Sequence, residues 1–109
     1  MLQRPSEQAR FSATRMTKLD CFRSARLLVG LNCFEAGQGQ SVHVHSGADK
    51  FYFVVSGKAR FVVGETTVEA RAGDLVLAPE GVPHGVAQAT ERTVVLVGIA
   101  PAPTSSAPL

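Results

Sequence analysis

Apolar and polar residues alternate with a period of two along most of the chain, and glycine interrupts the alternation every few residues. Such alternation is typical of half-buried β-strands, and no segment has a convincing helical spacing. Glycine and proline in "AGQGQ", "VSGKA", "RAGD" and "PEGVP" supply the tight turns between strands. We therefore predict eight or nine strands, at roughly residues 15–22, 26–35, 40–46, 50–56, 58–63, 66–71, 74–78, 84–89 and 93–100.

Many short, evenly spaced strands indicate an all-β sandwich or a closed barrel. A chain of 109 residues buries one compact core but not two, so we expect a single barrel domain over residues 13–100. Residues 1–12 stay unassigned. Residues 101–109, "PAPTSSAPL", hold three prolines and no apolar pattern, and we expect a disordered tail there.

Composition excludes several classes of function. The apolar runs are too short for a membrane helix. The net charge of +2 comes without interleaved aromatic residues, so we expect no nucleic-acid partner. The beginning of the chain lacks the apolar core of a secretory signal, and we expect a cytoplasmic protein with Cys21 and Cys33 reduced.

One strand is apolar on both of its faces. In "KFYFVV", Tyr52 and Val54 share one face, while Phe51, Phe53 and Val55 share the other. A small barrel has only one interior, so neighbouring strands, the N-terminal segment or another subunit must cover the second face. A homodimer is the simplest source of cover, and we expect one.

The three histidines fall in places that suggest a metal site. His43 and His45 are one residue apart, so on a strand their side chains leave the same face, with Cα atoms about 6–7 Å apart. His84 follows Gly81 and Pro83, which stiffen its approach to the next strand. Three imidazoles suit Fe, Mn, Ni, Zn or Cu and leave coordination positions open for a substrate. We therefore predict one divalent first-row transition metal on these histidines.

Two glycine-framed motifs contain the histidines. The first runs through Gly37, His43, His45, Lys50 and Gly57. The second runs through Gly73, Pro79, Gly81, His84 and Gln88. These motifs resemble those of the cupin family, in which asparagine is usual at the position of Gln88, and the resemblance covers residues 37–88 closely. It implies a double-stranded β-helix, or jelly-roll, barrel with the three histidines as metal ligands inside it. It also implies that the position of Lys50 would normally supply a carboxylate ligand.

Lys50 is therefore the departure from the family pattern. Asp49 would replace the carboxylate only through a bulge, and the six residues between Lys50 and Gly57 favour Lys50 as the inward residue. An ammonium about 4 Å from a divalent ion is repelled by about 8 kcal/mol at an effective dielectric constant of 20. Deprotonating a free lysine at pH 7 costs about 4.6 kcal/mol. Lys50 would then be neutral beside a metal, or swing away to bind an anionic substrate group. The alternative is that it reaches the barrel mouth and pairs with an acid such as Glu80.

Two functions follow from this pattern. The first is a mononuclear metal-dependent enzyme of the dioxygenase, isomerase or lyase type, acting on a small oxygenated or carboxylated molecule, with Lys50 and Tyr52 as the catalytic candidates. The alternative is a non-catalytic module that binds or senses a small ligand, with or without metal. A purely structural barrel is disfavoured because three buried imidazoles would each need a partner.

Overall fold

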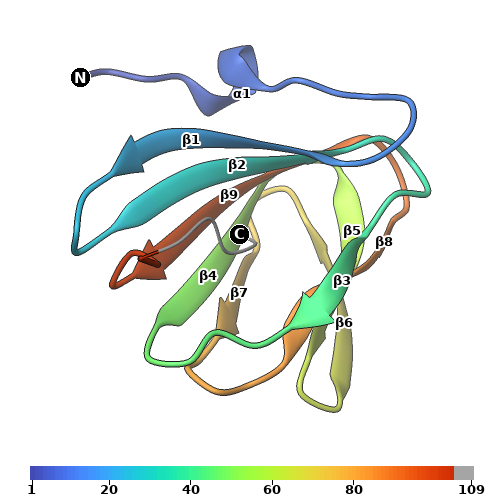
Figure 1. Ribbon diagram of the computed structural model, residues 1–109. Coiled ribbons are helices and arrows are strands. Elements are labelled where there is room, and N and C mark those ends of the chain that lie inside the picture. The colour runs from blue at the N-terminus through green and yellow to red at the C-terminus, as the bar shows by residue number, and fades with distance from the viewer. Residues whose placement is uncertain (105–109) are drawn as a thin grey trace.

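The computed structural model describes residues 1–104, and nearly all of their regular structure is β-strand (Figure 1). One helical turn, α1 (Pro5–Gln8), precedes the strands. The nine strands of this part of the chain are β1 (Thr17–Arg23), β2 (Leu28–Phe34), β3 (Gln40–His43), β4 (Asp49–Ser56), β5 (Lys58–Val63), β6 (Thr66–Arg71), β7 (Leu75–Ala78), β8 (His84–Ala89) and β9 (Thr93–Ala100). The expected strand pattern is confirmed. No helix in residues 1–104 is long and apolar enough to span a bilayer.

The strands form two antiparallel sheets that face each other. One sheet has five strands in the order β1-β2-β9-β4-β7, and the other has four in the order β3-β8-β5-β6. Apart from the hairpins β1-β2 and β5-β6, consecutive strands lie in different sheets, as in a jelly roll. Figure 1 shows the two layers enclosing one interior. The predicted double-stranded β-helix barrel is confirmed.

The inward faces of both sheets form the main core. Its largest members are fully buried: Tyr52, Phe34, Phe61, Leu28 and Ile99. Burying a side chain of this size stabilises the fold by about 1.5–3 kcal/mol. The alternation along strands such as β4 and β7 therefore decides which residues face the interior. It brings a few polar side chains in with the apolar ones.

The outer face of the five-stranded sheet carries a second apolar cluster. Leu31, Cys33 and Val94 are buried there, and Ala9 and Phe11 from the N-terminal segment pack against them. The N-terminal segment thus covers part of the outer apolar face that the sequence predicted to be covered.

Another part of this face remains open. Phe53 is 37% exposed, Leu75 59% and Leu77 61%, on the adjacent strands β4 and β7. The expected homodimer stays a prediction, and this patch is the surface that a second subunit would have to cover.

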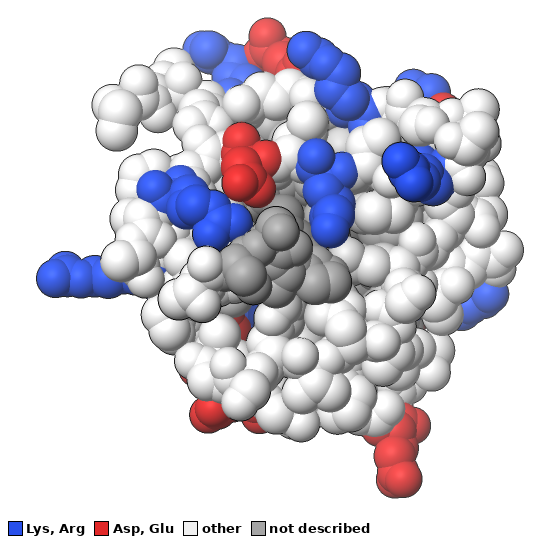
Figure 2. Space-filling model, in the orientation of Figure 1, with Lys and Arg blue, Asp and Glu red and all other residues white. Residues whose placement is uncertain are grey.

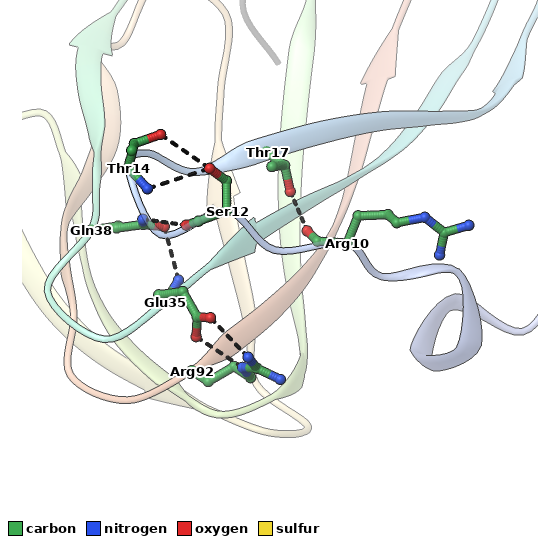
Figure 3. A network of polar contacts seen from close by, with 7 residues as sticks. All are labelled: Arg10, Ser12, Thr14, Thr17, Glu35, Gln38 and Arg92. Carbon is green, nitrogen blue, oxygen red and sulfur yellow. Dashed lines mark hydrogen bonds and ion pairs between the residues drawn. The ribbon is translucent and has the colours of Figure 1, made fainter.

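Polar contacts fasten the N-terminal segment to the barrel (Figure 3). We call residues 9–16 the N-terminal strap. The Gln38 side chain donates to the Ser12 carbonyl at 2.8 Å, and its own oxygen accepts from the Glu35 amide at 2.9 Å. Arg92 donates twice to the Glu35 carboxylate at 2.8 Å, and its guanidinium lies 4.1 Å from the Phe11 ring centre. The strap, which the sequence left largely unassigned, therefore has a defined path into β1.

The packed chain continues past β9. Ala102 is buried in the main core, and the Pro103 carbonyl accepts a hydrogen bond from Arg23 at 3.0 Å. These contacts extend beyond residue 100, where the sequence placed the start of a disordered tail. The remainder of that expected tail, residues 105–109, lies outside the described residues.

Two motif glycines have left-handed backbones but different surroundings. Gly57 has φ +88°, and a Cβ there would lie 2.2 Å from the Arg92 carbonyl oxygen. Gly73 has φ +93°, and a Cβ there would meet no described atom within 4 Å. Conformation alone penalises alanine at both sites, whereas the steric clash is confined to Gly57.

We predict that Gly57→Ala destabilises the fold much more than Gly73→Ala does. Backbone strain costs about 1–2 kcal/mol at each position. Only Gly57→Ala must also displace Arg92 and Thr93, where the chain enters β9. Urea unfolding of both variants measures the difference. Equal losses of unfolding free energy would show that the close approach at Gly57 does not limit the fold.

Candidate metal centre

The three histidines come from two adjacent strands and one loop. His43 ends β3, and His84 begins β8 directly opposite it in the antiparallel ladder. His45 lies two residues beyond the end of β3, so the prediction that the strand continues to residue 46 was wrong. Val42 and Val44 are each 53% exposed, whereas His45 is 7% exposed, so the alternation of side chains outlasts the ladder. The pair therefore reaches one site although only His43 is on the strand.

The imidazoles converge closely. Their ring centres are 4.5 Å apart for His43 and His84, 5.0 Å for His43 and His45, and 5.2 Å for His45 and His84. One ligand nitrogen from each ring lies within 4.8 Å of the other two. Nitrogen ligands on one ion, at about 2.1 Å each, lie at most about 4.2 Å apart. Small side-chain rotations would therefore complete the site.

Backbone carbonyls orient two of the rings. His43 Nδ1 donates to the Ser41 carbonyl and His84 Nδ1 donates to the Val82 carbonyl, each at 2.9 Å. A proton held on Nδ1 leaves the lone pair on Nε2. The Nε2 atoms of His43 and His84 are buried, and neither has a hydrogen-bond partner within residues 1–104. These two nitrogens are thus prepared to act as ligands.

A close approach between β3 and β8 sets the spacing of His43 and His84. A Cβ at Gly39 would lie 2.6 Å from the Val86 carbonyl oxygen, and one at Gly85 would lie 2.9 Å from the Gln40 carbonyl oxygen. The sequence analysis did not single out these two glycines. A glycine inside a strand pattern is the available signal, because it often marks a close backbone approach.

Lys50 points into the barrel and Asp49 points out. Lys50 is only 3% exposed, whereas Asp49 is exposed and its carboxylate accepts from the Glu80 amide at 2.9 Å. Asp49 therefore does not replace the missing carboxylate. The Glu80 carboxylate accepts from the Gly47 amide at 2.7 Å, and no carboxylate in residues 1–104 forms an ion pair with Lys50. The alternative that Lys50 pairs with an acid at the mouth is wrong.

Burial changes the protonation of Lys50 and Tyr52. Desolvation, aided by the positive charge of Lys18, lowers the pKa of Lys50 to about 7. Desolvation raises the pKa of Tyr52, so its phenol keeps its proton at neutral pH. Lys50 Nζ lies 4.5 Å from the centre of the Tyr52 ring, and neither polar group has a hydrogen-bond partner among the described residues. The barrel thus holds an amine poised between its charged and neutral forms beside a phenol.

Burial also favours neutral imidazoles. It lowers the pKa of His84 to about 4, the charge of Lys50 acts in the same direction, and the hydrogen bond to Val82 opposes them. Burial likewise lowers the pKa of His43. Both rings are therefore neutral at pH 7, which is the form that binds metal.

Three other residues considered in the sequence lie away from the histidines. Cys33 is buried in the outer cluster with Cys21 packed against it, and both thiols are free. Gln88 accepts a hydrogen bond from Arg60 on the neighbouring strand β5. The Gln88 side chain, which stands where the family usually has asparagine, thus makes a contact between strands.

Comparison with known proteins agrees with this architecture. The profile described as "Cupin domain" matches residues 30–99, which is more than half of the chain. This chain belongs to the cupin family. The matched segment contains all three histidines and Lys50, so the departure at Lys50 lies within the cupin domain itself.

The cupin also resembles individual proteins along most of its length. An uncharacterized protein of Streptomyces coelicolor is 37% identical over 83 residues, covering 76% of this chain and 78% of the relative. The crystal structure of TT1209 from Thermus thermophilus is 36% identical with a TM-score of 0.89, covering 94% of this chain and 98% of that one. An RmlC-like cupin from Desulfovibrio desulfuricans is 33% identical with a TM-score of 0.80, covering 87% and 91%.

The depressed pKa of His84 predicts acid destabilisation of the metal-free cupin. Its folded pKa of about 4 lies below its ordinary value of 6.5, so between these pH values the unfolded chain binds a proton that the folded one excludes. Stability is therefore lost as pH falls from 6.5 to 4, by about 3 kcal/mol for this one group.

Urea unfolding at pH 7 and pH 4.5 checks this, with His84→Gln as the comparison. The variant should lose less stability than the parent over that interval. NMR titration of the His84 ring gives a second reading that does not depend on the variant. An imidazole that titrates at its ordinary pKa would contradict the prediction.

Proposed function

We propose that this cupin holds one divalent first-row transition metal on His43, His45 and His84 and is a mononuclear metal-dependent enzyme. The observation that carries the proposal is the cluster of three ligand nitrogens within 4.8 Å, in a barrel whose burial keeps the rings neutral. The substrate class we propose is a small oxygenated or carboxylated molecule, and the reaction is of the dioxygenase, isomerase or lyase type.

The chain's own residues define what happens around the ion. A divalent metal on three imidazoles supplies Lewis acidity and open positions for a substrate oxygen or dioxygen. Tyr52, with its proton retained, donates a hydrogen bond from the barrel wall to a substrate oxygen. Lys50 accepts a proton as a neutral amine or orients an anionic group as an ammonium, and a pKa of about 7 gives it access to both states.

The absence of a carboxylate among the described ligands changes the charge of the centre. Three neutral imidazoles leave the two positive charges of the ion uncompensated, whereas a glutamate ligand would remove one of them. A more positive centre attracts anions more strongly and binds the metal itself less tightly. Lys50 therefore favours an anionic substrate at the expense of metal affinity.

A second candidate function is non-catalytic binding or sensing of a small ligand, with or without metal. The connections between successive strands from β3 to β9 favour it, because each has five residues or fewer, which leaves little chain to form a lid. Turnover of any small molecule by the metal-loaded protein, lost in Lys50→Met, would favour the enzyme. Ligand binding without turnover would favour the sensing module.

We also propose that the cupin acts in the cytoplasm on a small molecule, without a nucleic-acid or membrane partner. Two observations support this location and this partner class. Cys21 and Cys33 are free thiols, as is usual in a reducing compartment. A hollow of about 300 Å³ beside His43 has the size of a small-molecule site.

Metal analysis tests the proposed centre. We expect protein purified without an affinity tag or added metal to carry close to one first-row metal ion per chain, and His43→Ala to lose it. Val44→Ala is the matched control, because this neighbouring side chain is 53% exposed and points away from the histidines. Mass spectrometry of the metal content of the purified protein gives the ratio of metal ions to chains. Parent protein that neither contains nor takes up Fe, Mn, Ni, Zn or Cu would end the enzyme proposal.

Substitution at Lys50 tests its place beside the ion. We expect Lys50→Glu to bind Zn²⁺ at least about tenfold more tightly at pH 7, since it replaces a repelling amine by a carboxylate ligand. Lys50→Met, which removes only the charge, should lie between the two. The gap between Lys50→Met and the parent should narrow at pH 8.5, where the parent amine is mostly neutral. Three identical affinities would place Lys50 away from the metal.

A further inference from the structure

The barrel is open between two edge strands. β1 ends the five-stranded sheet and β3 ends the four-stranded sheet, and no ladder joins them in residues 1–104. A hollow of about 300 Å³ lies there, lined by Met16, Lys18, Gly39, Gln40, Ser41 and His43. A second hollow of about 470 Å³ is lined by Arg15, Met16, Thr17 and Lys18. The two share Met16 and Lys18, and we call them together the slot. Because His43 is one of its lining residues, the slot reaches the edge of the histidine cluster.

The wall of the slot formed by β1 is basic. Leu19 and Cys21 pack outward against the second cluster, so the alternation of β1 turns Lys18 to the opposite side, toward the slot. Lys18 is exposed, and it forms no ion pair with any residue of 1–104. Arg15 lines the hollow of about 470 Å³, and neither hollow has a carboxylate among its lining residues. In Figure 2 several lysine and arginine side chains lie over the upper half of the face, where β1 runs in Figure 1, with some acidic side chains among them.

Lys18 also lies close to the histidines. Lys18 and His43 line the same hollow, so the Lys18 ammonium is within electrostatic reach of the histidine cluster. A molecule in the slot therefore meets the cationic groups of Arg15 and Lys18. The acid nearest to them on β1, Asp20, forms an ion pair with Arg23 and lines neither hollow. Two cationic groups without an acidic lining residue favour anions.

We propose that the slot between β1 and β3 is the entrance for a small carboxylate, and that Lys18 binds its carboxylate group beside His43. The inference rests on the proposed function and narrows its substrate class from oxygenated or carboxylated molecules to carboxylates. The hollow of about 300 Å³ beside His43 is at the lower end of the size range for ligand sites, so it fits a compact acid better than a long one. Lys18 is a binding residue in this scheme, whereas the chemistry remains with the interior groups.

Calorimetric titration of the full-length protein as purified, with succinate as the probe, tests the slot. Succinamide has nearly the same shape without the charge, and ionic strength is held constant. We expect saturable binding of succinate and none of succinamide. Lys18→Gln should weaken succinate binding by about tenfold, the usual effect of losing one charged hydrogen bond, and Lys18→Arg should restore most of it. Lys58→Gln is the control, because it removes the same charge from a separate hollow beside Glu69 and Asp74.

The outcomes separate this inference from the proposed function, because metal content is measured on the same samples. Lys18→Gln should keep the parent's metal content. Saturable, Lys18-dependent binding of succinate in a protein without metal would support the slot and end the metal-enzyme proposal. Metal-loaded protein that ignores succinate, binds succinamide equally, or responds to Lys58→Gln as much as to Lys18→Gln would overturn the slot and leave the proposed function intact.

Discussion

The ladder between β3 and β8 is the constraint on which the site depends. It sets His43 opposite His84, and the two strands come so close that Gly39 and Gly85 leave no room for a side chain. Hydrogen bonds from Nδ1 to the carbonyls of Ser41 and Val82 then fix the ring orientations from the same two segments. Backbone hydrogen bonding between these two strands therefore positions His43 and His84 more precisely than mobile loops would.

Lys50 shows how folding alters the energetics of this centre. In water, neutralising a lysine at pH 7 costs about 4.6 kcal/mol, which would weigh against any nearby metal. In the barrel, burial lowers the pKa of Lys50 to about 7, so neutralising this lysine at pH 7 costs little. Most of the cost has already reduced the stability of the fold. The lysine is thus compatible with a metal in a way that its chemistry in solution does not suggest. The fold gives up some stability to hold an amine that changes charge near neutral pH.

Much of this arrangement could be predicted from local sequence. Period-two alternation and glycine turns gave the strands, because both are properties of neighbouring residues. The spacing from Lys50 to Gly57 gave the inward side of β4. Sequence did not show that His45 leaves the strand, because hydrogen bonding to a partner strand decides where a ladder ends. Nor did it show the slot, since the opening between β1 and β3 depends on which edges the two sheets leave unpaired.

The N-terminal strap has a consequence for how such a protein could diversify. It contains Arg15 and Met16 and runs into Lys18. Its contacts with the barrel, from Ser12 to Gln38 and from Phe11 to Arg92, therefore position one wall of the slot. The histidines depend on a backbone ladder that tolerates little change, whereas the strap depends on a few side-chain contacts at the surface. Substitutions in the strap could therefore reshape what enters the barrel while the ion site stays as it is. Under the proposed function, selectivity and reactivity would thus rest on different contacts, and each could vary on its own.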